Sequence, residues 1–168
     1  WGEVADFFCG EWNVMGADLM NEPFAGKWDG SRSDWRRGAS RMGNAVLRHC
    51  PRLLIIVQGT SNPGMFGENL VGVKATKPGS AATGMVMLSN QSKFVFSAHI
   101  YGPSLFLRSR GAPKQFQAAK FPSNLPGYWE WLYGHVTEAG VPLLMGEVGG
   151  EGTGLVCYIN QLTDASDM

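Results

Sequence analysis

Four short apolar runs recur along the chain, and each follows a segment in which apolar residues have helical spacing. The runs are residues 14–20, 53–58, 94–100 and 143–147. Each run is followed by a segment rich in glycine, proline and asparagine, residues that favour turns. Nearly continuous apolar strands that alternate with helices are typical of a parallel sheet buried on both faces. The pattern therefore predicts an α/β fold with parallel strands.

One helix can be placed with definite ends. Residues 34–49 carry apolar side chains at helical spacing, and Pro51 ends this helix. Ser33 or Asp34 would be its N-cap, because a side-chain oxygen there can accept a hydrogen bond from an otherwise unpaired amide. Further helices are expected near residues 2–9, 129–140 and 155–163.

The lengths of the connecting segments indicate where a binding site would lie. Segments that enter the expected strands are short, whereas the segments that leave them are long, with residues 59–93 and 102–127 the longest. In a (β/α)8 barrel the loops after the strands form the active face. The long loops therefore lie on the side where such a fold binds its substrate. An open, doubly wound sheet would show the same alternation of helices and strands.

Charge and hydropathy argue against two classes of partner. Fourteen Lys and Arg residues balance fourteen Asp and Glu residues, so the formal net charge is zero. The chain therefore lacks the excess positive charge with which proteins bind nucleic acids or anionic membrane surfaces. Its longest aliphatic run, residues 53–57, is far shorter than the roughly 18 residues that span a bilayer. We expect neither a nucleic-acid partner nor a membrane partner.

Two glutamates stand at the ends of two expected strands. Glu22 follows the run 14–20, and Glu147 ends the run 143–147. The carboxyl ends of parallel strands lie at one edge of a sheet, so both side chains could face a single substrate bond. Glycoside hydrolysis needs such a pair, because one protonated carboxyl donates to the leaving oxygen while the other attacks or activates water. The alternative is that each glutamate caps a helix or pairs with an arginine.

The residues around these glutamates resemble glycoside hydrolase family 5, a retaining cellulase family. Its fourth-strand, sixth-strand and seventh-strand motifs are similar to residues 14–23 (VMGADLMNEP), 97–103 (SAHIYGP) and 144–150 (LMGEVGG). The fifth strand and a loop common in its cellulases are similar to residues 53–59 and 69–73. The resemblance implies an incomplete (β/α)8 TIM barrel, in which the chain covers roughly strands 4 to 7 with their helices. Residues 1–168 would then be part of one catalytic domain, with no second domain.

The resemblance also implies roles for particular residues. Glu22 would be the general acid/base and Glu147 the nucleophile of a double displacement. Asn21 would hydrogen-bond the sugar 2-hydroxyl, an interaction that strengthens in the transition state. His99 and Tyr101 lie two residues apart, hence on one face of a strand. In the family this histidine contacts the substrate and the tyrosine orients the nucleophile, although a strand histidine can also be an ordinary core or surface residue.

Sugar rings stack on flat aromatic side chains, and Trp28 follows the first motif closely enough to serve as such a platform. Phe66 and Phe106 are weaker candidates. Trp28 could instead anchor its own loop. Trp35 and Trp129 fit the core faces of helices and are interpreted as packing residues.

No cofactor and no metal are expected. The glycine-rich residues 149–154 fit neither a dinucleotide fingerprint nor a phosphate loop. The three histidines, His49, His99 and His135, show no spacing typical of metal ligands, and the proposed chemistry needs no metal.

Three cysteines, Cys9, Cys50 and Cys157, cannot all pair within the chain. Cys9 and Cys50 end consecutive helices just before consecutive strands, so they lie at the same end of the expected barrel. A disulfide between them is one hypothesis, and two buried thiols are the alternative.

Taken together, the motifs predict a retaining hydrolase of β-linked polysaccharide, most simply a secreted endo-β-1,4-glucanase that is monomeric when complete. A β-mannanase or a β-1,3-glucanase would share both glutamates. A non-catalytic or inactive carbohydrate-binding fragment is the alternative from another class. The family also uses an arginine and a histidine from earlier strands and a tryptophan after the eighth, and these have no counterpart here. Because a cut barrel has open edges, we expect the isolated chain to be inactive or prone to aggregation.

Overall fold

The computed structural model describes residues 1–27, 31–60, 85–101, 120, 123–130 and 135–149. Its strands are β1 (Gly16–Asp18), β2 (Leu54–Gln58), β3 (Phe94–Tyr101) and β4 (Leu143–Gly149). Its helices are α1 (Gly2–Phe8), α2 (Trp35–His49), α5 (Leu125–Trp129) and α6 (His135–Glu138), with a 3-10 turn η2 (Gln91–Lys93).

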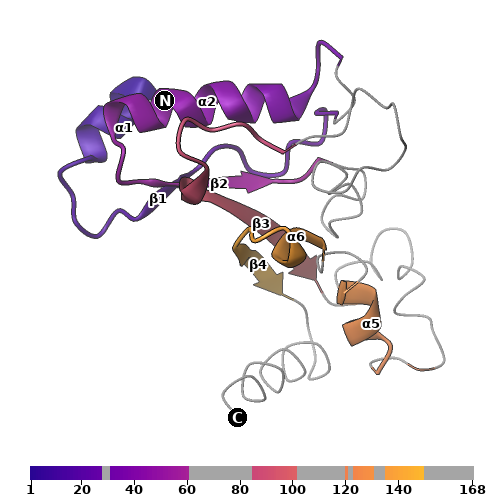
Figure 1. Cartoon of the computed structure of the whole chain (residues 1–168). Coiled ribbons are helices and arrows are strands. Elements are labelled where there is room, and N and C mark those ends of the chain that lie inside the picture. The colour runs from indigo at the N-terminus through magenta and orange to yellow at the C-terminus, as the bar shows by residue number, and fades with distance from the viewer. Residues whose placement is uncertain (28–30, 61–84, 102–119, 121–122, 131–134, 150–168) are drawn as a thin grey trace.

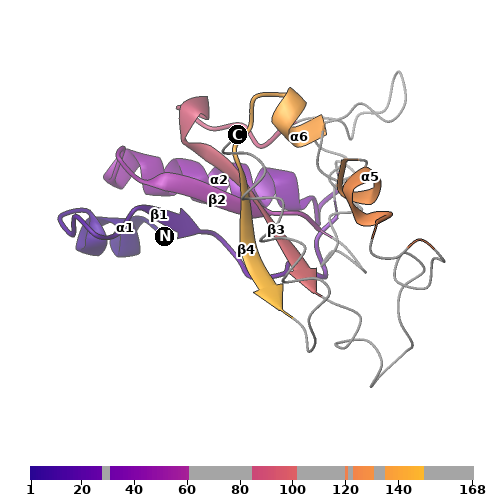
Figure 2. The same ribbon diagram turned by 90° about the horizontal axis from the view of Figure 1, so that it is seen from below.

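The four strands form one parallel sheet in the order β1-β2-β3-β4. Strands that are neighbours in sequence are therefore neighbours in the sheet, as in a barrel built from successive strand–helix units. The sheet is twisted: in Figure 2, β1 and β2 run across the view, whereas β3 and β4 point downward. The predicted α/β class with parallel strands is confirmed.

The first strand is shorter than predicted. Of residues 14–20 only Gly16–Asp18 form β1. Before the strand, the Arg52 guanidinium donates hydrogen bonds to the carbonyl oxygens of Cys9 at 2.7 Å and Val14 at 2.8 Å, and these contacts hold the segment between α1 and β1 as a turn. Bonds to β2 continue one residue beyond each end of β1, since Met15 accepts from the Leu54 amide and the Leu19 amide donates to Ile56.

The helix α2 packs on the sheet through small and branched side chains. Asp34 is its N-cap, and the Asp34 carboxylate accepts a hydrogen bond from the amide of Arg37. Gly43 allows a close approach, since a Cβ atom there would lie 2.8 Å from Ile55 Cγ2. The centre of the core consists of Ala39, Val46, Ile55, Val57 and Phe96, each at most 1% exposed. Figure 1 shows α1 beside α2 on the same side of β1 and β2.

The expectation that every strand is buried on both faces is wrong for β4. Leu144, Met145 and Val148 are between 36% and 42% exposed. The strand lies at one edge of the described sheet, so its side chains have neighbouring strands on one side only.

The predicted helix over 129–140 is described in part. The structure has α5 before it and α6 near its end, and residues 131–134 lie outside the described residues. The predicted end is confirmed, because Gly140 has φ +73° and its amide bonds to the carbonyl oxygen of Thr137. This left-handed conformation suits glycine and ends helices. The side chain of Trp129 and the helix expected at 155–163 also lie outside the described residues.

The ends of α1 and α2 are joined covalently. Cys9 and Cys50 form a disulfide with their Cα atoms 5.5 Å apart, which confirms the first of the two hypotheses. Beside it, His49 Nδ1 lies 2.8 Å from a carboxylate oxygen of Asp6. The disulfide, this pair and Arg52 together hold α1 against α2. Among the described residues, none of the helices is long and apolar enough to cross a membrane.

The disulfide predicts the number of free thiols. The chain has three cysteines, so the unfolded chain should show one reactive thiol without reductant and three after reduction. Titration with a thiol reagent in denaturant measures both values. Replacing Cys50 with serine should free Cys9 and give two thiols in the unreduced chain. Three thiols before reduction would contradict the disulfide.

Candidate active site

Three strands bring polar side chains together near the carboxyl edge of the sheet. Glu22 follows β1, His99 lies in β3 and Glu147 lies in β4. The nearest ligand atoms of these three side chains all lie within 4.8 Å of one another. Residues that are far apart in the sequence are therefore neighbours here, and the two predicted glutamates face each other.

The register between β3 and β4 decides the position of Glu147. Ala98 is paired with Met145, but His99 is paired with Glu147, so Gly146 is an extra residue in β4. Without this bulge Glu147 would be paired with Ile100, and paired residues of parallel strands point to the same side. The bulge thus turns Glu147 to the side of His99, as bulges beside active sites often do. A Cβ atom at position 146 would overlap Ser97 Oγ, so a side chain there would force the Ser97 side chain to move.

Glu22 has an unusual backbone conformation. Its φ is 42°, in the left-handed region that non-glycine residues rarely adopt. Such a conformation costs of order 1–3 kcal/mol and persists only where the surroundings impose it. The amide of Glu22 donates a hydrogen bond of 2.8 Å to Gln58 Oε1. In this way the neighbouring strand stabilises the conformation that directs Glu22 away from the path of β1.

Gln58 is a positioning residue that the sequence motifs did not indicate. Its side chain accepts from Glu22 and donates to Asp18 at 2.9 Å, while its carbonyl oxygen accepts from the Trp35 indole at 2.8 Å. Gln58 is buried, at 5% exposure. The buried indole confirms that Trp35 is a packing residue. The only signal in the sequence was a polar residue at the end of an otherwise apolar run.

His99 lies between the two glutamates. Its Nδ1 is 3.0 Å from Glu22 Oε1 and 3.6 Å from Glu147 Oε2. The ring is 4% exposed, so most of its surface contacts protein. This histidine is therefore neither an isolated core residue nor a surface residue, because it bridges both carboxylates.

Tyr101 lies on the same face of β3, and its hydroxyl donates a hydrogen bond to Glu147 Oε2. This hydrogen bond raises the pKa of Tyr101 to about 12, with smaller contributions from burial and from the negative charges of Glu147 and Glu22. Each of these effects favours the neutral phenol. Tyr101 therefore remains a hydrogen-bond donor to Glu147 throughout the neutral pH range.

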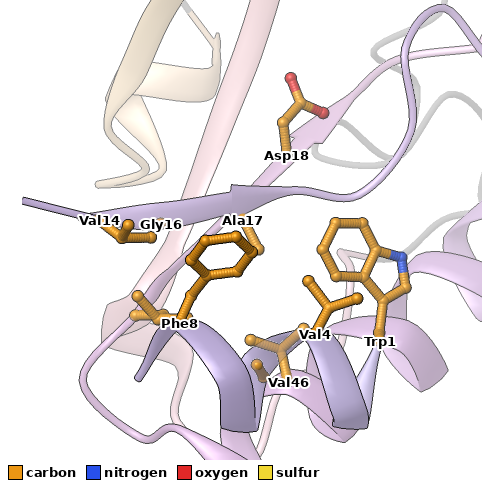
Figure 3. A pocket seen from close by; sticks show the side chains of 10 residues that line it. Trp1, Val4, Phe8, Val14, Gly16, Ala17, Asp18 and Val46 are labelled. Atoms are coloured by element: carbon orange, nitrogen blue, oxygen red, sulfur yellow. The ribbon is translucent and has the colours of Figure 1, made fainter. Parts of the chain in front are cut away.

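The other predicted site residues are less well placed by the structure. Asn21 precedes Glu22 and is exposed. Trp28, Phe66 and Phe106 lie outside the described residues. An apolar pocket of about 270 Å³ between α1, β1 and α2 contains none of the candidate site residues. Figure 3 shows Trp1, Val4 and Phe8 around this pocket, whereas the side chain of Asp18 points away from it.

Parallel strands alternating with helices, with two carboxyl groups facing each other at the carboxyl edge, are typical of (β/α)8-barrel glycoside hydrolases. The family model described as "Cellulase (glycosyl hydrolase family 5)" matches residues 1–166. The chain belongs to this family, and its four parallel strands form part of the barrel.

Individual relatives agree with this assignment. An endoglucanase of Paenibacillus polymyxa is 35% identical over 94% of this chain and 39% of its own length. A solved structure of the endocellulase from Pyrococcus horikoshii with cellotetraose is 32% identical, with a TM-score of 0.73, over 98% of this chain and 49% of that one. The catalytic domain of the major endoglucanase from Xanthomonas campestris pv. campestris is 28% identical, with a TM-score of 0.73, over 97% of this chain and 47% of that one. The chain thus spans about half or less of the length of these relatives.

The contact between Tyr101 and Glu147 predicts how the tyrosine titrates. Its pKa should be near 12 in the folded chain, compared with about 10 in an unfolded one. The resulting contribution to stability is complete below pH 10 and is lost as the pH rises toward 12, because the folded state holds this proton more tightly.

The difference in tyrosinate absorbance between the wild-type protein and Tyr101→Phe isolates this residue from the other three tyrosines. Glu147→Gln, which removes the charged acceptor, should lower the pKa of Tyr101. A Tyr101 that titrates near 10 in both backgrounds would contradict the contact.

Proposed function

We propose that the protein containing this chain is a retaining glycoside hydrolase that cleaves β-1,4-linked glucan within the polymer, an endo-β-1,4-glucanase. The observation that carries this proposal is the facing pair of carboxyl groups, with one oxygen of Glu22 and one of Glu147 within 4.8 Å of each other. Retaining enzymes hold their carboxyl groups about 5–5.5 Å apart, whereas inverting enzymes leave roughly 6.5–9.5 Å for a water molecule. The short separation favours retention.

In the first step, a carboxylate oxygen of Glu147 attacks the anomeric carbon. The bond from that carbon to the glycosidic oxygen breaks, and Glu22 gives its proton to the departing oxygen. In the second step, Glu22 takes a proton from water while the water oxygen attacks the same carbon and releases Glu147. Net, one water is consumed and the β configuration is retained.

The surroundings of each carboxyl group support these roles. The Tyr101 hydroxyl donates to Glu147, which stabilises its ionised, nucleophilic form and restricts its orientation. His99 hydrogen-bonds Glu22, the group that must donate and then accept a proton. Asn21, next to Glu22, would hydrogen-bond the sugar 2-hydroxyl, and Trp28 would stack on a sugar ring.

The substrate is proposed from the relatives. They are endoglucanases, and one solved neighbour is a complex with cellotetraose. This favours β-1,4-glucan over mannan and β-1,3-glucan. A neutral polysaccharide also suits a chain of zero net charge. One relative is a "major extracellular endoglucanase", which supports the proposal that this protein is secreted.

We also propose that residues 1–168 are part of a single catalytic domain that is monomeric when complete. In the described sheet β1 is paired with a strand on one side only. Near its other side lie the pocket and partly exposed apolar side chains, among them Trp1, Val4 and Phe8. Further strand–helix units of a barrel would cover this surface.

Removing either carboxyl group should slow hydrolysis, but the two losses should differ in size. Glu147→Gln should leave no measurable turnover, because the amide cannot form the covalent intermediate. Glu22→Gln should lower kcat by about 10²–10⁴ for unactivated glucan, and much less for an aryl glycoside whose leaving group needs no proton. Asp6→Asn is the matched control, since Asp6 also pairs with a histidine but lies on α1, and this variant should keep normal rates. Near-normal turnover of Glu147→Gln would show that the nucleophile is another residue.

The specificity proposal is tested with three polymers. Reducing-end release from carboxymethylcellulose should exceed release from mannan and from laminarin, and viscosity should fall early, as expected for cleavage within the chain. Faster release from mannan would identify a mannanase with the same two glutamates. Binding of all three polymers without any release would indicate a non-catalytic carbohydrate-binding protein.

A further inference from the structure

We propose that Glu22, His99 and Glu147 also form a binding site for a single Zn²⁺ ion, which would exclude the substrate from the same carboxyl groups. The binding part of this inference does not depend on the proposed hydrolase function. The exclusion of substrate does.

The donor atoms have a spacing that a zinc ion can use. Zn²⁺ binds imidazole nitrogen and carboxylate oxygen at about 2.0–2.2 Å in a tetrahedron, which places neighbouring ligand atoms about 3.3–3.6 Å apart. Here His99 Nδ1 lies 3.0 Å from the oxygen of Glu22 and 3.6 Å from that of Glu147. The whole set spans no more than 4.8 Å, so small side-chain movements complete three corners of a tetrahedron. The fourth corner remains for water.

Charge also favours a divalent cation here. Two carboxylates and a neutral imidazole would balance the two charges of the ion. In the part of the chain that the structure describes, the ion pairs of Glu22 and Glu147 are with His99, and none is with a lysine or an arginine. A cation would therefore displace the proton in the hydrogen bond between His99 Nδ1 and Glu22 Oε1, but no lysine or arginine. The Glu147 side chain is 41% exposed, which leaves a route from solvent.

The backbone and a buried hydroxyl support the same geometry. The bulge at Gly146 places the backbone of Glu147, and the hydrogen bond that the Glu22 amide donates to Gln58 places the backbone of Glu22. Metal-binding histidines donate their second ring N–H to an oxygen. Ser97 Oγ is buried without a hydrogen-bond partner, and it flanks Gly146 together with His99 Nε2. If the metal-bound ring turned its Nε2–H toward this hydroxyl, Ser97 Oγ would gain the partner that it lacks.

The ligand set selects among metals. Mg²⁺ and Ca²⁺ require six or more oxygen ligands and use nitrogen poorly. Imidazole and carboxylate ligands suit Zn²⁺ and its neighbours in the first transition row. A bound ion would occupy the Glu22 oxygen that carries the transferred proton and the Glu147 oxygen that attacks carbon. Metal and glucan would therefore compete for one site.

Calorimetric titration of the purified protein with ZnCl2 tests the site. Cys157→Ser is the background, because a free thiolate also binds zinc. We expect one zinc site that requires the cluster, and no comparable binding of MgCl2. Glu22→Gln, Glu147→Gln and His99→Gln should each weaken zinc binding at least about tenfold. His49→Gln is the matched control, because His49 also contacts a carboxylate at 2.8 Å but belongs to a pair on the surface of α1 and α2.

Denaturant unfolding of each variant separates loss of binding from loss of the fold, and the two Glu→Gln changes conserve shape. Co²⁺ gives an independent measure, because a tetrahedral site produces an intense visible absorption that the Glu→Gln variants should lack. Equal zinc affinity in all variants, a loss confined to His49→Gln, or no binding would overturn the proposal.

Activity measurements distinguish the two proposals. If glucan is hydrolysed but no zinc binds to the cluster, the metal site is wrong and the hydrolase function stands. If zinc binds through these three residues and no glucan is cleaved, the metal site stands and the function is wrong. If both hold, inhibition by zinc should be competitive with cello-oligosaccharide and reversed by a chelator.

Discussion

The position of Glu147 beside His99 depends on one extra residue in β4. Side chains of a strand alternate between its two faces, so the pairing register determines which residues can meet. The bulge at Gly146 shifts that register just before the glutamate and brings it level with His99. Glycine fits there because Ser97 Oγ on the adjacent strand occupies the position that a Cβ atom would take. The contacts of Glu147 with His99 and Tyr101 follow from this shift.

The second carboxyl group is held by different means. Glu22 leaves the sheet in a left-handed conformation, and its amide is bonded to the buried side chain of Gln58. Gln58 is in turn held by Asp18 and by the indole of Trp35. The strain at Glu22 is thus offset by the hydrogen bond that its amide donates to the scaffold, as expected where a side chain must be presented in one orientation. Helix α2, through Trp35, takes part in this positioning although it lies away from the carboxyl groups.

The proposed hydrolysis and the proposed zinc binding would use the same side chains. A retaining hydrolase needs two carboxyl groups close together, with one able to exchange a proton and the other ionised. The imidazole between them supplies a nitrogen ligand atom, 3.0 Å from an oxygen of Glu22 and 3.6 Å from an oxygen of Glu147. Such a group of atoms also satisfies the ligand requirements of a small divalent ion. Proton transfer and metal binding would exclude each other, because both would use the same carboxylate oxygens.

Much of this arrangement could be predicted from the residues. The apolar runs predicted β2, β3 and β4 as parallel strands with ends close to those observed, and helix signals predicted the end of α2 at His49 and a helix end at Gly140. The turn before β1 was missed, because the hydrogen bonds of Arg52 to carbonyls of an earlier segment are long-range. The role of Gln58 was missed for the same reason.

The sequence by itself determined the α/β class, the family motifs with their candidate catalytic residues, and the pair of cysteines that lies at one end of the sheet. These are properties of local pattern and of residue type. The tertiary structure decided how the pattern is used: the bulge that turns Glu147, the strained backbone of Glu22 and the placement of His99 between two carboxylates. Each of these depends on the register and packing of strands that are distant in the chain, and such distances are set by the fold rather than by any local run of residues.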